Sequence, residues 1–170
     1  NNLFQFMKEI SSRTKSMLLA TATPVQLHPI EAWDLLNLLN QWDHRILGDA
    51  WSPWNRPGEA LTAVLDANPR SLTLEEFWQY VRNPLPPEEE KTREGRRDFR
   101  SFRQSLSVSS AEFLLSQESL NQMSPSDRDR LQQLRQTFFA DHNPFIRTIV
   151  RRTRHYLEET IDPETGKPYL

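Results

Sequence analysis

The chain contains no cysteine, which excludes disulfide bonds and thiolate metal sites. It has only 4 glycines in 170 residues, and this leaves little material for the glycine-rich loops that cradle phosphate groups. No apolar stretch reaches the 18 residues of a membrane span, and no signal peptide is recognisable. We therefore expect no secretion and no membrane role for this segment, with a cytoplasmic location as the default.

Neither sign of charge is in clear excess, because 21 Lys and Arg residues and 23 Asp and Glu residues give a formal net charge of only -2. A charge of this size gives no long-range attraction to nucleic acid, so any DNA contact must come from local basic stripes. The residues are 36% hydrophobic and 26% charged, which is polar for a chain long enough to bury a core. Long exposed helices would explain this composition.

What is present is mostly helical periodicity, which predicts a mainly α fold of several helices. Thr73 and Glu76 form a capping-box pattern at the start of one helix. The tryptophans are expected in the core: Trp33, Trp42, Trp51, Trp54 and Trp78. Helices are expected over residues 3–10, 29–42, 88–106 and 145–159, with others near Leu61, Thr73, Ser109 and Ser124.

One segment departs from this pattern. Residues 17–20 are short and uniformly apolar, and Pro24 prevents a strand from continuing. The sequence therefore predicts one short strand, at about 16–22, of the kind buried on both faces of a parallel sheet. The loop after such a strand lies at its carboxyl end, where open α/β sheets place their ligand chemistry.

This loop reads Thr21-Ala22-Thr23-Pro24 with Gln26 two residues later, and Glu31-Ala32-Trp33-Asp34-Leu35-Leu36-Asn37-Leu38-Leu39 follows. It resembles motif III of the superfamily-two helicases and, more narrowly, of the Swi/Snf-type ATPases that translocate on double-stranded DNA, particularly bacterial members. The resemblance implies that the strand belongs to a RecA-like α/β sheet. It also implies that motif III couples ATP hydrolysis to DNA binding through Thr21, Ala22, Thr23, Pro24 and Gln26.

A second segment carries the same resemblance. Pro144, Phe145, Arg151, Arg152, Thr153 and Arg154 are similar to the Pro-Phe-x-x-Arg-Arg-Thr-Lys segment that leads out of the first lobe of these ATPases, although with a longer spacing. In a continuous helix, Arg147, Arg151 and Arg154 would line one face and Arg152 the opposite flank. The resemblance implies that these four arginines contact DNA or another motor lobe.

The resemblance implies three parts: the end of the first RecA-like lobe (1–42), a helical insertion (43–143), and a basic helix and tail leading toward the second lobe (144–170). The phosphate-loop pattern and the Asp-Glu-x-His box are missing from this sequence. We therefore expect the chain alone to be catalytically inactive and to hold no cofactor. ATP, Mg²⁺, double-stranded DNA and the remaining motor lobes would be cofactors and partners of the parent enzyme.

Other interpretations stay open. The main alternative is a helical protein-protein interaction module without ATPase activity, with a protein partner on the insertion. A free-standing hydrolase is disfavoured because no nucleophile, base and oxyanion site converge, and neither Asp43-His44 nor Asp141-His142 supplies a dyad or metal-ligand spacing. One basic stripe could follow a DNA backbone, but a solvated face balanced by nearby acids is favoured: Arg93, Arg96, Arg97, Arg100 and Arg103.

Overall fold

The computed structural model describes residues 2–20, 28–65, 71–88, 96–150 and 158–168. These residues are mainly helical, so the predicted fold class is confirmed. Between the helices the chain is irregular, apart from an isolated antiparallel bridge that joins Ile161 to Pro168 in the tail. The elements are α1 (Asn2–Ser11), α2 (Pro29–Leu39), η1 (Pro53–Asn55), α3 (Pro57–Leu65), α4 (Leu74–Arg82), α5 (Arg96–Ser105), α6 (Ser119–Gln122), α7 (Pro125–Leu134), α8 (Phe138–Asp141) and α9 (Pro144–Thr148).

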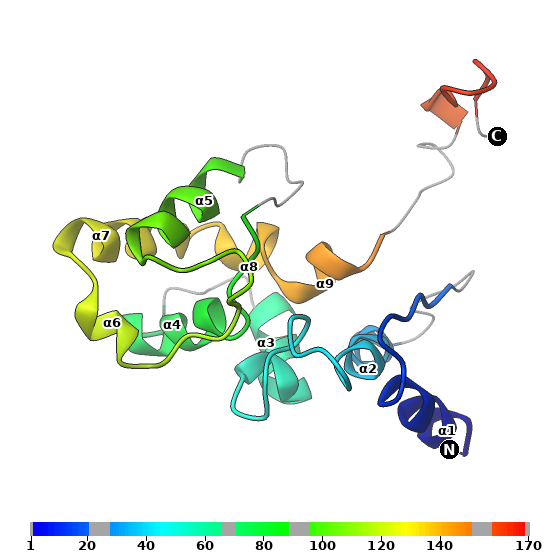
Figure 1. Ribbon diagram of the computed structural model, residues 1–170, viewed down its shortest axis with the longest axis horizontal. Helices are drawn as coiled ribbons and strands as arrows, with labels where there is room; N and C mark the ends of the chain where they lie inside the picture. Colours follow the sequence, from blue (N-terminus) through cyan, green and yellow to red (C-terminus); the bar gives the residue numbers. More distant parts are fainter. Residues whose placement is uncertain (1, 21–27, 66–70, 89–95, 151–157, 169–170) are drawn as a thin grey trace.

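The helices form an elongated arrangement (Figure 1). Helices α4 to α7 gather at one end, α3 and α8 lie in the middle, and α1 and α2 lie at the other end near the N-terminus. Helix α9 returns from the middle toward α2, and the tail leads away from the body. The two ends of the described chain thus lie on the same side of the molecule.

An aromatic core joins η1, α4 and α8. Trp54, Phe77 and Phe138 are almost fully buried, and the rings of Phe77 and Phe138 meet edge to face at 5.4 Å between centroids. Sixteen buried residues form one cluster, and fourteen of them lie between residues 43 and 143. The other two are Trp33 and Leu36 of α2. Burial of large rings is the main source of stability in such a core.

The local signals for the helix starts at Thr73 and Ser124 were accurate. Thr73 and Glu76 make both hydrogen bonds of the capping box at the start of α4. The Ser124 hydroxyl accepts a hydrogen bond from the Asp127 backbone N–H and caps α7. Caps are predictable because they depend on residues only three positions apart.

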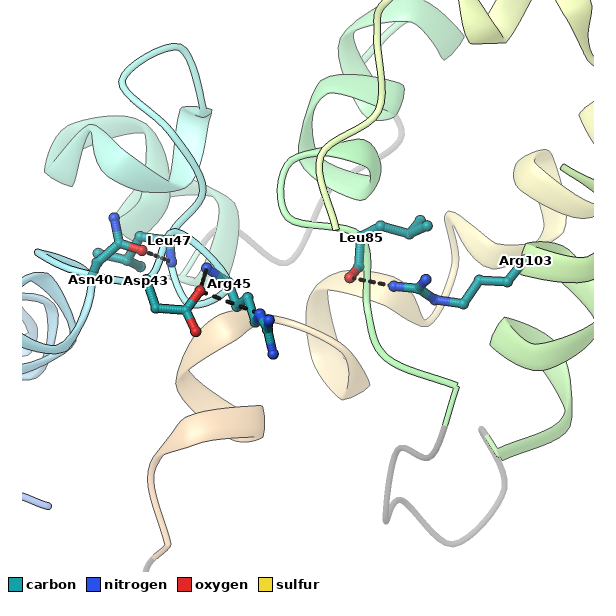
Figure 2. Close-up of polar contacts among 6 residues, drawn as sticks. All are labelled: Asn40, Asp43, Arg45, Leu47, Leu85 and Arg103. Atoms are coloured by element: carbon teal, nitrogen blue, oxygen red, sulfur yellow. Dashed lines mark hydrogen bonds and ion pairs between the residues drawn. The ribbon is translucent and has the colours of Figure 1, made fainter. Parts of the chain in front are cut away.

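The ends of helices were less predictable. Helix α2 ends at Leu39 rather than at residue 42, because the Asn40 side chain accepts from the Leu47 backbone N–H (2.8 Å) and donates to the Gly48 carbonyl (2.9 Å), turning the chain away (Figure 2). Helix α5 begins at Arg96, and residues 89–95 lie outside the described ranges. No helix opens at Ser109, because Phe113 and Leu115 instead bond the backbone of Leu85 and Arg82.

Two further expectations are corrected. The strand expected at 16–22 is not formed over residues 16–20, the part of it that is described, because a strand requires a pairing partner and the described residues supply none. The helix expected over 145–159 ends at Thr148, and Ile149 is extended. Three β-branched residues in succession, Thr148, Ile149 and Val150, disfavour its continuation.

The prediction for the tryptophans was correct for three of the five. Trp33, Trp54 and Trp78 are buried, whereas Trp42 and Trp51 are 57% and 79% exposed. Within the described ranges, none of the helices combines the length and the apolar character that a membrane crossing requires.

Candidate functional site at the junction of α1, α2 and α9

The candidate motif III residues Thr21, Ala22, Thr23, Pro24 and Gln26 lie outside the described residues, but both of their flanks are described. Residues 16–20 precede them and α2 follows from Pro29. Arg151, Arg152 and Arg154 also lie outside the described ranges, whereas Arg147 is half-buried in α9. The site can therefore be built from the elements on either side of the motif.

These flanking elements meet. Helix α2 contacts α1 on one side and α9 on another, and the Ser11 hydroxyl at the end of α1 donates a buried hydrogen bond to the Leu38 carbonyl of α2. A cavity of about 370 Å³ lies at this junction. Its walls come from the end of α1 and the segment after it, from the end of α2 and the loop that follows, and from Thr148 of α9.

Residues 16–19 line this cavity, and the segment 16–20 is irregular. Leu18 is 92% exposed, although Met17 and Leu19 on either side of it are half-buried. The structure gives the backbone of residues 16–20 no hydrogen bond from the described residues. An apolar segment with an unpaired backbone is a template for pairing with another strand.

Helix α9 is anchored by Asn143, the residue before it. Asn143 is buried; its side-chain carbonyl accepts from the Ile146 backbone N–H, and its amide donates to the Phe139 carbonyl at 2.8 Å. Because α9 ends at Thr148, Arg147 does not share a continuous helical face with Arg151 and Arg154, and that expectation is corrected.

Charges at the junction are few and partly paired. Partial burial raises the pKa of Asp34 on α2, and the nearby Lys8 of α1 opposes this shift. Asp43 accepts from the Arg45 backbone N–H and lies 3.4 Å from the Arg45 Nε (Figure 2). These contacts favour a packed junction between elements over an acid-base site.

The described histidine at position 142 is part of the core. His142 is buried and packs edge to face on Phe99, with 4.6 Å between ring centroids. Within the part of the chain that is described, no group of three or more His, Asp or Glu side chains could hold a metal ion. His142 therefore serves the aromatic core.

The sequence analysis missed the role of Arg103. Both interpretations of the basic stripe placed it on an exposed face, but its side chain is 1% exposed. Its guanidinium donates to the carbonyls of Pro86, Leu85, Ser109 and Glu112, and burial lowers its pKa. Figure 2 shows the bond to Leu85.

A sequence signal for this burial existed. Phe99, Phe102 and Leu106 are spaced so that they share one face of a helix. Arg103 follows Phe99 by four positions and precedes Leu106 by three, which places it on the same apolar face and not on the opposite, exposed one. Arg103 thus ties the chain on both sides of α5 to the helix.

Comparisons of the chain with protein-family models, curated proteins and solved structures found no match. The functional argument therefore rests on the motifs in the sequence and on the junction described above.

Proposed function

We propose that this chain is part of a Swi/Snf-type, DNA-dependent ATPase, with motif III in residues 21–26 and a helical insertion between that motif and the exit segment. The observation that carries the proposal is the segment 16–20. It is apolar and irregular, its backbone makes no hydrogen bond with the described residues, and Leu18 is almost fully exposed. This is the state expected of a sheet strand whose partner strands lie outside this chain.

The distribution of exposed apolar side chains supports the same proposal. Among the described residues, eight of the eleven exposed large apolar residues come from the two ends: Leu3, Phe6, Ile10, Leu18 and Trp42 before residue 43, and Ile146, Val150 and Ile161 after residue 143. Isolated exposed apolar residues are normal, but such a bias toward both ends favours a surface that another part of a larger protein covers.

In this proposal the phosphate chemistry lies elsewhere in the parent enzyme, which binds ATP and Mg²⁺ outside this chain. Motif III couples the nucleotide state to DNA through the hydroxyls of Thr21 and Thr23, because hydroxyls exchange hydrogen-bond partners at a cost of only ~1 kcal/mol. Double-stranded DNA and the other motor lobes are the proposed partners. Arg147, Arg151, Arg152 and Arg154 are the proposed DNA or lobe contacts.

A second candidate, a helical protein interaction module without ATPase activity, is favoured by one observation. The insertion holds most of an aromatic core of its own and presents Trp51 on a loop anchored by the Asp49 and Arg56 side chains. An exposed, well-anchored tryptophan is typical of a protein contact. This candidate predicts no nucleotide hydrolysis by the protein that contains the chain.

The test is the double substitution T21A/T23A in the full-length protein that contains this chain. We expect ATP binding to be nearly unchanged and the stimulation of hydrolysis by double-stranded DNA to fall. T62A is the matched control, because Thr62 is exposed on α3, away from the motif. Loss of nucleotide binding in the double variant would place motif III in the pocket and contradict the coupling role.

A further inference from the structure

The cavity at the junction of α1, α2 and α9 is lined by exposed as well as half-buried apolar side chains. Its volume of about 370 Å³ lies within the range of natural binding sites. Leu18 and Trp42 line it and are 92% and 57% exposed. Leu39 and Ile46 line it too and are half-buried. Large apolar side chains exposed around a concave surface are typical of a binding site.

Polar groups of the same lining have no partner within the described residues. The Lys15 ammonium takes part in no hydrogen bond or ion pair with them, and neither do the hydroxyls of Ser16 and Thr148. The backbone of residues 16–19 also makes no hydrogen bond with the described residues. Donors and acceptors that a ligand could pair with thus gather beside the apolar side chains.

The charges of the lining favour an acidic ligand. Asp43 supplies a negative charge, but it accepts from the Arg45 backbone N–H and lies 3.4 Å from the Arg45 Nε. Lys15 supplies a positive charge and has no such counterpart among the described residues. A carboxylate brought to Lys15 gains an ion pair there, whereas a cation is repelled.

The burial of residues 17–19 alternates along the chain. Met17 and Leu19 are half-buried, and Leu18 between them is almost fully exposed. A period of two side chains is that of a β-strand, although this segment is irregular in the chain by itself. When a peptide binds by adding a strand, backbone hydrogen bonds supply the affinity and pockets for side chains supply the specificity. The unpaired backbone of residues 16–19 and the cavity that it lines provide both.

We propose that this cavity and residues 15–19 bind an extended segment of a partner polypeptide that carries a large apolar side chain and a nearby carboxylate. The segment pairs with the backbone of residues 16–19, its apolar side chain enters the cavity beside Trp42, and its carboxylate lies at Lys15. This inference goes beyond the proposed function, because it concerns described residues of this chain and needs neither motif III nor ATP.

The experiment measures binding of a labelled probe peptide to the 170-residue chain by fluorescence anisotropy. The probe is a capped heptapeptide with tryptophan at its centre, aspartate two positions to either side and threonine elsewhere. A second probe carries asparagine in place of both aspartates. We expect saturable binding of the acidic probe and about fivefold weaker binding of the neutral one, as the loss of an ion pair gives.

Two pairs of variants test the assigned residues. K15Q removes the difference between the acidic and neutral probes, whereas K167Q keeps it, because Lys167 is exposed in the tail. W42A weakens binding of the acidic probe about tenfold, as truncation of an interface tryptophan does. W51A is the matched control and leaves binding unchanged, because Trp51 is also exposed but does not line the cavity.

Several results would overturn the docking site. They are the absence of saturable binding to the unaltered chain, equal affinity for the two probes, and equal losses in W42A and W51A. A second copy is the occupant instead if the chain sediments as a dimer that W42A breaks and the acidic probe does not displace.

Folding and the proposed function are controlled separately. Circular dichroism checks each variant, and should W42A fail to fold, L18S tests the same lining, because Leu18 is 92% exposed. We expect L18S to weaken binding of the acidic probe, and unchanged binding would overturn the site. The assay contains neither ATP nor DNA, so a failure here leaves the proposed function untouched, and an absence of ATPase activity leaves the docking site untouched.

Discussion

Arg103 is a charged residue that is buried and stabilises the fold through hydrogen bonds. It has no carboxylate partner at hydrogen-bonding distance among the described residues, and its guanidinium instead serves four backbone carbonyls from two separate segments. Arginine suits this use because its planar group offers five donors in a fixed geometry. The segments before and after α5, which have little regular structure of their own, are thereby held together.

Replacing this guanidinium should be costly. We expect R103M to lower the free energy of unfolding of the chain by about 3 kcal/mol, because buried carbonyls lose their donors while most of the side-chain volume remains. Urea unfolding followed by circular dichroism measures this change. R13M is the control, since the Arg13 pair with Glu9 is exposed and contributes little. Equal unfolding midpoints for R103M and the unaltered chain would contradict the structural role.

Gly48 is a second position where one residue decides the local structure. Its φ is +79°, and a Cβ there would meet the side chains of Asn83 and Ser52, the latter at 2.6 Å. These neighbours belong to the network in which Asp49 exchanges hydrogen bonds with the Asn83 side chain. Only glycine fits both the backbone conformation and the space.

We therefore expect G48A to lower the free energy of unfolding by about 2 kcal/mol or more. G58A is the matched control, because nothing lies within 4 Å of a Cβ at Gly58 and this position is in the first turn of α3. That substitution should be neutral or stabilise by about 0.5 kcal/mol. Thermal unfolding of both variants decides the point, and equal midpoints would show that the loop adapts to a Cβ.

At the scale of elements, the exit segment divides into two parts. Helix α9 is capped by Asn143 and packs on α2, whereas Ile149 and Val150 leave the helix before the basic residues 151–154 begin. Arg147 thus belongs to the packed part. In the proposed function, α9 serves packing and the arginines beyond it contact DNA or another lobe.

The prediction at this scale concerns salt. R151Q/R154Q in the full-length protein should reduce the salt dependence of DNA binding by about one counterion for each phosphate contact that is lost. The free energy of unfolding should change by no more than ~1 kcal/mol. Binding to a DNA duplex across a salt series, with urea unfolding in parallel, measures both quantities. Strong destabilisation with an unchanged salt slope would indicate a structural network instead.

The elements also show what sequence could predict. The mainly helical fold and the caps at Thr73 and Ser124 depend on local patterns, and they were predicted correctly. The ends of α2 and α9 were not, because Asn40 binds a loop eight residues away and Ile149 follows a β-branched residue into an extended conformation. The junction of α1, α2 and α9 around one cavity could not be predicted, because it depends on tertiary contacts that no local sequence pattern contains.

At the scale of the whole molecule, the described residues contain a well-packed insertion and two poorly covered ends. Residues 43–143 bury most of their aromatic side chains, with Trp51 an exception, while α1, the segment 16–20 and residues 146–150 leave large apolar side chains exposed. This asymmetry is what the proposed function expects of a chain whose ends belong to a larger motor lobe. The same proposal accounts for the absence of the predicted strand over residues 16–20, since its partner strands would lie outside this chain.

The most direct measurement is the rate of ATP hydrolysis by the full-length protein that contains this chain, with and without double-stranded DNA. The proposal predicts hydrolysis that rises when the duplex is added, and none above background for the 170 residues by themselves. Hydrolysis by the 170-residue chain in a clean preparation, or a full-length protein that hydrolyses no ATP in the presence of DNA, would contradict it.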